Sequence, residues 1–170
     1  MKTRSIVVDF GQLVTIADYK EKIADKLKDI DIAMLFLNAG YLPVGPFADM
    51  SYMDIQRTVG CNALHPIYLA KVLVDQLLAR NHLTALVITS SGLGIIPAPG
   101  VITYSASKSF ASFLAIGLSY ELEGKVDCMS WTLGMTDTKL LSMPNKKTNP
   151  LIATRKEAVD GMLRDIGRQN

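Results

Sequence analysis

The chain has 170 residues, of which 49% are hydrophobic and 20% are charged, and its 18 Lys and Arg nearly balance its 16 Asp and Glu. This composition excludes a disordered chain and indicates one domain that spans residues 1–170. The formal charge of +2, without clusters of basic and aromatic residues, argues against a nucleic-acid partner.

The cysteines and the apolar runs indicate which kinds of site and segment the chain lacks. Cys61 and Cys128 have no second Cys or His at ligand spacing, so we expect neither a disulfide framework nor a metal site. No apolar run reaches the ~18 residues that a membrane span requires. We therefore expect no transmembrane segment in this chain.

Short apolar runs alternate with amphipathic ones, a pattern typical of an α/β fold. Four runs, at residues 5–8, 32–37, 85–89 and 126–132, predict parallel strands buried on both faces. Helices are expected at 18–28, at 51–78 as a short helix running into a long one, and at 104–123. A loop at 141–153 is long enough to form a lid. The capping box Thr154-Arg-Lys-Glu157 then begins a last helix, which ends near Gly167.

Three short motifs carry candidate chemistry. Tyr104-Ser-Ala-Ser-Lys108 places a phenol and an ammonium on one helical face, where the positive charge favours the phenolate. Ser90-Ser91-Gly92 and Asn38-Ala39-Gly40 each follow a predicted strand, where α/β sheets bind ligands. Taken singly, the first motif is better explained by an exposed pair on a helix, and the other two are better explained by turns.

Taken together with Asn62, these motifs resemble the short-chain dehydrogenase/reductases in order and spacing. Pro97-Ala98-Pro99 and Thr138-Lys139-Leu140 resemble the group that contains very-long-chain 3-oxoacyl-CoA reductases and 17β-hydroxysteroid dehydrogenases. The resemblance implies an NADP-dependent reductase of a lipid-like carbonyl compound, a 3-oxoacyl-CoA or a keto-steroid, with NAD not excluded as cofactor. The apolar coverage of residues 61–78 and 104–123 exceeds what one sheet face can bury, so we expect these helices to form a subunit interface in a homodimer or a larger assembly. The resemblance implies a cytoplasmic or endoplasmic-reticulum-associated location.

The same resemblance assigns roles to residues. Tyr104 would protonate the carbonyl oxygen, Ser91 would hydrogen-bond it, and Lys108 would hold the nicotinamide ribose and lower the phenol pKa. Asn62 would hold a water that links Lys108 to solvent. Pro66 lacks the amide that would occupy the Asn62 carbonyl, although it could equally mark only a junction between helices. The remaining cofactor contacts are implied at Asp9 on the adenine and at Asn38, Ala39, Gly40, Tyr104 and Thr138, mainly on the ribose and nicotinamide. His65 and His82 are expected at helix surfaces or ends, without a catalytic role.

The chain departs from the family at its beginning. It enters at the family's third strand, without the glycine-rich turn whose amides bind the pyrophosphate. The predicted fold is therefore an incomplete Rossmann-like, doubly wound parallel sheet that lacks the first two strands. The run at 5–8 would then have to dock elsewhere or hang loose. We interpret the chain as a reductase fragment that is inactive alone. The alternatives are a non-catalytic structural or regulatory subunit and a small-molecule sensing module.

Overall fold

The centre of the molecule is a parallel sheet. The computed structural model describes residues 2–140 and 149–168. Within these residues the sheet contains β1 (Met34–Leu37), β2 (Thr84–Ser91) and β3 (Val126–Leu133), in the order β1-β2-β3. All eight residues of β2 are buried, as expected for a central strand covered on both faces. The predicted α/β fold with an incomplete parallel sheet is confirmed.

The prediction of a strand at residues 5–8 is wrong. Residues 2–9 form no strand, and Asp9 begins a turn in which its backbone carbonyl accepts from the Gln12 N–H at 3.0 Å. Val8 packs against the core, whereas Val7 is 97% exposed. The physical reason is pairing: an apolar run becomes a strand only where a neighbouring strand accepts its hydrogen bonds. No described strand takes that position beside residues 5–8.

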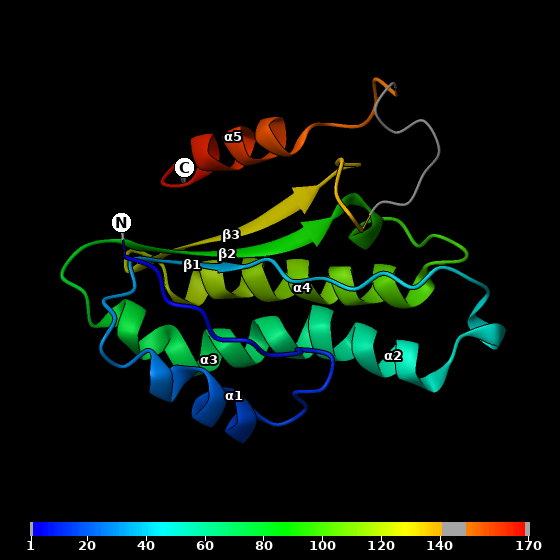
Figure 1. The fold of residues 1–170 in the computed structure, drawn as a ribbon. Helices are drawn as coiled ribbons and strands as arrows, with labels where there is room; N and C mark the ends of the chain where they lie inside the picture. Colours follow the sequence, from blue (N-terminus) through cyan, green and yellow to red (C-terminus); the bar gives the residue numbers. More distant parts are fainter. Residues whose placement is uncertain (1, 141–148, 169–170) are drawn as a thin grey trace.

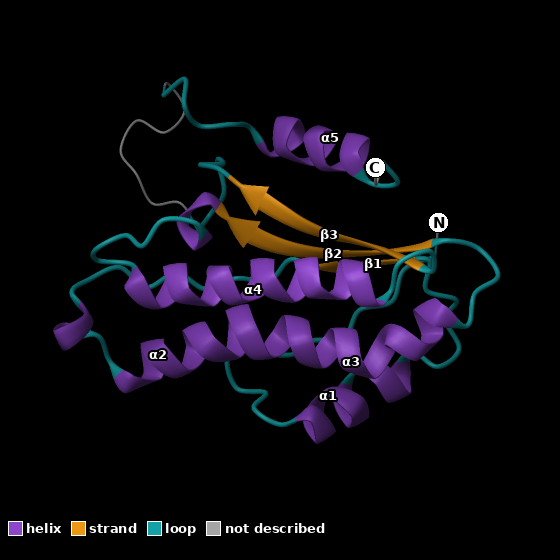
Figure 2. Ribbon diagram, turned by 180° about the vertical axis from the view of Figure 1, so that it is seen from behind, coloured by secondary structure: helices purple, strands orange, loops and turns teal. Residues whose placement is uncertain are grey.

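Helices cover both faces of the sheet (Figures 1 and 2). The layer that contains α1, α2, α3 and α4 lies on one face, and α5 lies on the other. Their bounds are α1 Ile16–Lys22, α2 Tyr52–Val59, α3 His65–Leu78, α4 Ile102–Glu121 and α5 Arg155–Asp165. None of the described helices is long and apolar enough to cross a membrane.

The helix ends follow the sequence signals closely. The capping box at Thr154 and Glu157 is present, and Gly124 and Gly167 take positive φ values of 75° and 79° just beyond α4 and α5. The predicted helix at 18–28 is instead α1, followed by the 3₁₀ turn η1 (Ala24–Lys26). The lid predicted at 141–153 falls largely on residues 141–148, outside the described residues.

The predicted helix at 51–78 contains a π-helical turn, η3 (Gly60–Leu64), between α2 and α3. The His65 N–H donates to the Gly60 carbonyl, five residues back. Pro66 follows and has no N–H to offer the Cys61 carbonyl in the same register. The His65 Nδ1 lies 3.1 Å from that carbonyl oxygen, so the side chain supplies the hydrogen bond that the proline cannot.

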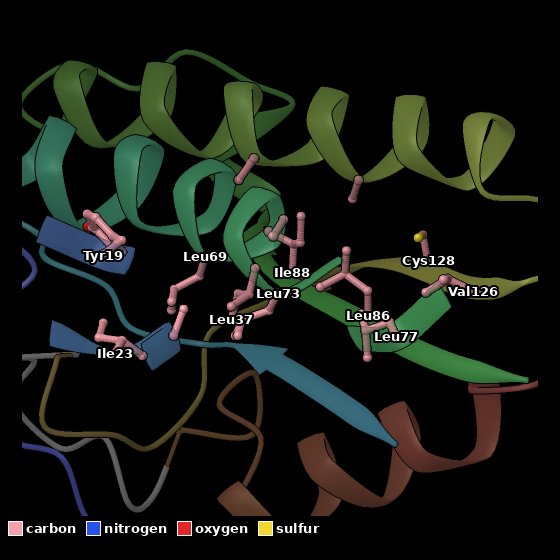
Figure 3. Close-up of a cluster of buried hydrophobic side chains, with 14 of the residues drawn as sticks. Tyr19, Ile23, Leu37, Leu69, Leu73, Leu77, Leu86, Ile88, Val126 and Cys128 are labelled. Carbon is pink, nitrogen blue, oxygen red and sulfur yellow. The ribbon is translucent and has the colours of Figure 1, made fainter. Parts of the chain in front are cut away.

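The hydrophobic core lies between the sheet and the helical layer. Figure 3 shows Leu69, Leu73 and Leu77 of α3 packed toward Leu37 and Ile88 of the sheet. Ala111 and Ala115 of α4 belong to the same cluster and allow that helix to approach the strands closely. This close approach brings α4, which carries Tyr104 and Lys108, against the end of β2.

Candidate active site

A cavity of about 470 Å³ lies where β1 and β2 end. Both carboxyl ends meet at one edge because the strands are parallel, with Leu37 paired to Ile88. Seven of the residues predicted from the sequence line this cavity: Asn38, Ala39, Gly40, Ser91, Tyr104, Lys108 and Thr138. The fold thus brings together residues that are 100 positions apart in the chain.

Tyr104 and Ser91 interact within this cavity. Both side chains are buried, and hydrogen bonding with Ser91 lowers the pKa of the phenol. Burial raises that pKa by more, so the net direction is upward from the ordinary value of 10.0. The influences on this pKa are burial and the Ser91 hydrogen bond, and the lowering expected from Lys108 is not among them. Tyr104 is a protonated phenol at neutral pH.

Lys108 is a buried ammonium. Only 3% of the residue is exposed, and its Nζ donates to the Thr89 carbonyl oxygen at 2.7 Å and lies 5.6 Å from the centre of the Tyr104 ring. Burial lowers its pKa to about 8. The ammonium has three donors, and within the described part of the chain one of them is used by Thr89.

Asn62 lies behind the turn that follows β1. Its Nδ2 donates to the Tyr41 carbonyl at 2.8 Å and to Ser107 Oγ at 3.0 Å, and its Oδ1 accepts from the Tyr41 N–H at 2.8 Å. A Cβ on Gly40 would lie 3.7 Å from both Asn62 Oδ1 and Lys108 Nζ. Asn62 therefore fixes the peptide beside Gly40 and holds it close to Lys108.

Asp9 lies apart from the cavity. It is exposed, and its carboxylate accepts from the Gly11 N–H at 2.9 Å and from Gln12 Nε2 at 3.1 Å. These contacts stabilise the turn at residues 9–12. Its contact with adenine stays a prediction.

His65 lies at the first position of α3, a helix end as expected, but it is not on the surface. It is buried, its ring centre lies 4.1 Å from that of Phe10, and burial lowers its pKa to about 4. The available signal was its spacing of four residues from Cys61, immediately before Pro66. His82, in contrast, is exposed, as expected.

A second, apolar groove lies between the loops that follow β1 and β2. Val44, Phe47, Pro97, Pro99 and Ile102 contribute to its lining. The Gly45 N–H donates to the Gly100 carbonyl at 2.8 Å and ties the two loops together. Leu42 and Leu93 of the same loops line the first cavity.

Comparison with known sequences supports the family inferred from the motifs. The family model for short chain dehydrogenases matches residues 1–149. A very-long-chain 3-oxoacyl-CoA reductase of Coccidioides immitis is 28% identical over 169 residues, which cover 98% of this chain and 47% of that protein. The protein of the same name from Neurospora crassa is 29% identical over 169 residues, covering 98% and 49%. The chain spans about half the length of the curated relatives it matches.

Solved structures show the same fold. A 7beta-hydroxysteroid dehydrogenase aligns with a TM-score of 0.81 at 23% identity, covering 96% of this chain and 63% of that one. A short-chain dehydrogenase from Sphingobium yanoikuyae in complex with NADPH aligns with a TM-score of 0.79 at 24% identity, covering 94% and 62%. With the family model matching residues 1–149 of 170, the chain belongs to the short chain dehydrogenase family.

Proposed function

We propose that this chain carries the reacting site of an NADP-dependent reductase that acts on a lipid-like carbonyl compound, a 3-oxoacyl-CoA or a keto-steroid. The observation that carries the proposal is the meeting of the Ser91 hydroxyl, the Tyr104 phenol and the Lys108 ammonium around one cavity. These three groups supply two hydrogen-bond donors for a carbonyl oxygen and one fixed positive charge.

The cavity residues fit the ribose and nicotinamide part of a dinucleotide. Lys108 keeps two N–H donors beyond the one given to Thr89, and ribose hydroxyls accept such bonds. The close approach of Gly40 to Lys108 leaves backbone rather than side chain at that wall of the cavity. Asn38, Ala39, Gly40, Lys108 and Thr138 are the residues that would hold the cofactor, which supplies hydride when it is bound.

Proton transfer falls to Tyr104. Because burial keeps its pKa above the ordinary value, the phenol holds a proton that it can donate to the carbonyl oxygen as negative charge develops there. Ser91 donates a second hydrogen bond to the same oxygen and orients it toward the phenol. Asn62 takes the role of holding the water that returns a proton by way of Lys108.

The substrate class rests on two observations. The groove beside the cavity offers an apolar lining to a hydrocarbon portion of the substrate. The curated relatives quoted above are named very-long-chain 3-oxoacyl-CoA reductases, and one structural neighbour is a hydroxysteroid dehydrogenase. NADP is favoured over NAD because the Sphingobium yanoikuyae structure contains NADPH.

The test is a titration followed by an assay. NADPH fluorescence titration of the chain joined to the family's glycine-rich phosphate-binding segment should give saturable binding, tighter than NADH, whereas the chain alone should bind weakly and show no turnover. A 3-oxoacyl-CoA and a keto-steroid are then supplied to the joined chain, and the loss of NADPH absorbance is followed. Binding with turnover that depends on Tyr104 supports the proposal. A folded joined chain that binds neither nucleotide favours the alternative of a structural or regulatory subunit.

A further inference from the structure

Two consecutive residues of β2 hold Lys108 at both of its ends. The Thr89 carbonyl accepts from Lys108 Nζ at 2.7 Å, and the Ser90 hydroxyl donates to the Lys108 backbone carbonyl at 2.8 Å. Ser90 is 1% exposed, so this bond is screened from water. The side chain and the main chain of Lys108 are thus fastened to neighbouring positions of one rigid strand.

A row of hydroxyls, buried at Ser90 and half-buried at Ser112 and Ser130, continues from the Ser90 bond. Ser90 Oγ and Ser112 Oγ lie 2.6 Å apart, and Ser130 Oγ of β3 donates to Ser112 Oγ at 3.4 Å. Ser90 has one proton and gives it to the Lys108 carbonyl, so Ser112 must be the donor in their mutual bond. The row therefore runs from Ser130 through Ser112 and Ser90 to Lys108, with every bond oriented the same way.

The segment that follows Ser91 contacts the peptide between Lys108 and Ser109. A Cβ on Gly94 would lie 2.8 Å from the Lys108 carbonyl carbon and 3.0 Å from the Ser109 nitrogen, closer than a side chain tolerates. Ser109 Oγ also donates to the Gly94 carbonyl. The turn η4 (Gly92–Gly94) is therefore pressed directly on the Lys108–Ser109 peptide.

We propose that Ser90 and Gly94 are positioning residues. One lies before Ser91 in the chain and the other after it, and together they form a clamp on the Lys108–Ser109 peptide. This clamp sets the distances among Ser91, Tyr104 and Lys108 before any ligand binds. The consequence of these fixed distances rests on the proposed function: they preorganise the site for the cofactor and the carbonyl group. The physical reason is geometric: Tyr104 lies one helical turn before Lys108, so a shift of this peptide moves both groups relative to Ser91.

Ser90→Ala and Gly94→Ala each test one side of the clamp. Competitive acetylation read by mass spectrometry reports the pKa of Lys108 itself, without any need for turnover. The wild-type value of about 8 should rise toward the ordinary 10.5 in both variants, because a displaced ammonium gains water. NADPH binding should weaken about tenfold. Ser109→Ala, which removes the bond to the Gly94 carbonyl, is the second variant if either of the others fails to fold.

Two controls separate positioning from general destabilisation. Ser112→Ala leaves the Ser90 donor on the Lys108 carbonyl, and Gly92→Ala places a Cβ no closer than 3.9 Å to the Leu133 carbonyl. Both should leave the pKa of Lys108 near 8. An unchanged pKa of Lys108 in folded Ser90→Ala, Gly94→Ala and Ser109→Ala proteins would overturn the inference. A wild-type chain joined to the family's glycine-rich phosphate-binding segment that shows the lowered pKa of Lys108 but binds no NADPH would instead remove the proposed function and leave the clamp in place.

Discussion

Burial acts on the two titratable groups of the site in opposite directions. It raises the pKa of the Tyr104 phenol and lowers that of the Lys108 ammonium to about 8, because in both cases the charged form loses hydration. Near neutral pH the phenol is protonated and the lysine is largely charged. These are the states in which one can donate a proton and the other can hold a hydroxyl-rich ligand.

Removing the phenolic hydroxyl separates chemistry from binding. Tyr104→Phe should lower the reduction rate by at least about a hundredfold, since a positioned general acid contributes on that scale. NADPH affinity should stay within about twofold, because the phenol is needed for proton transfer rather than for most of the nucleotide contacts. Steady-state assays and fluorescence titration measure the two quantities. Lys108→Ala is the comparison and should weaken both, and equal losses of affinity in the two variants would contradict this division of roles.

The lowered pKa of Lys108 also predicts an upper pH limit for NADPH binding. Its ammonium loses its proton as the pH rises through about 8, so NADPH affinity should hold at lower pH and decline above that value. Titration of NADPH at a series of pH values measures the decline. In Lys108→Arg, which stays charged throughout, the decline should be absent. A wild-type affinity that stays constant well above pH 8 would show that the charge of Lys108 does not hold the ligand.

The lowered pKa of His65 predicts that the folded chain becomes less stable at acidic pH. Its pKa is lowered to about 4 in the folded chain, from 6.5 in the unfolded chain, so the unfolded state binds more protons between these values. Stability is full above pH 6.5 and is lost as the pH falls toward 4, by up to about 3 kcal/mol. Denaturant unfolding at several pH values measures the loss. His65→Gln, which does not titrate, should show a smaller loss over the same range.

At the scale of elements, the π-helical turn is where the amino-terminal segment meets the helical layer. A Cβ on Gly60 would lie 2.9 Å from the Phe10 carbonyl oxygen and 3.3 Å from Gly11. Gly60 has ordinary helical dihedrals, so its lack of a side chain serves this close approach rather than backbone freedom. The turn also carries Asn62, whose three hydrogen bonds hold the peptide beside Gly40.

Gly60→Ala tests that contact. Helix propensity favours alanine by about 1 kcal/mol, but overpacking costs about 1–3 kcal/mol, so we expect a net loss in the free energy of unfolding. Gly117→Ala is a matched control, because Gly117 is also helical and a Cβ there meets nothing within 4 Å. Chemical denaturation should show the control unchanged or slightly more stable. Stabilisation by both substitutions would mean that residues 10–11 move away from the added side chain at little energetic cost.

At the scale of the whole molecule, α4 presents an apolar outer face. Phe113 and Tyr120 are 78% and 76% exposed, and Phe110 and Ile116 lie on the same helix and are also exposed. The side of α3 that carries Leu69, Leu73 and Leu77 is, in contrast, buried within the chain. The interface expected from both helices therefore rests on α4 in this structure, and a second copy of the chain is the occupant that we propose.

Phe113→Asp tests the proposed homodimer. A charge at the centre of the α4 face should shift the chain from dimer to monomer, because an unpaired carboxylate is costly to bury. Light scattering over a concentration series measures the change. Val7→Asp, at a position that is 97% exposed and is not part of α4, should leave the mass unchanged. A wild-type chain that is monomeric at high concentration removes the proposal.

The sequence by itself determined the α/β class, three of the strands, the capped helices and the residues that gather at the cavity. These follow from local rules: apolar runs, capping residues and the spacing of Tyr104 and Lys108 on one helical face. The tertiary structure alone decided three further points. Residues 5–8 form no strand because no strand among the described residues pairs with them. His65 is buried because the π-helical turn and Pro66 leave a carbonyl oxygen for its side chain. Ser90 and Gly94 both contact the Lys108–Ser109 peptide, which no sequence pattern predicts. Each depends on contacts between residues distant in the chain or on a helical register that periodicity does not report.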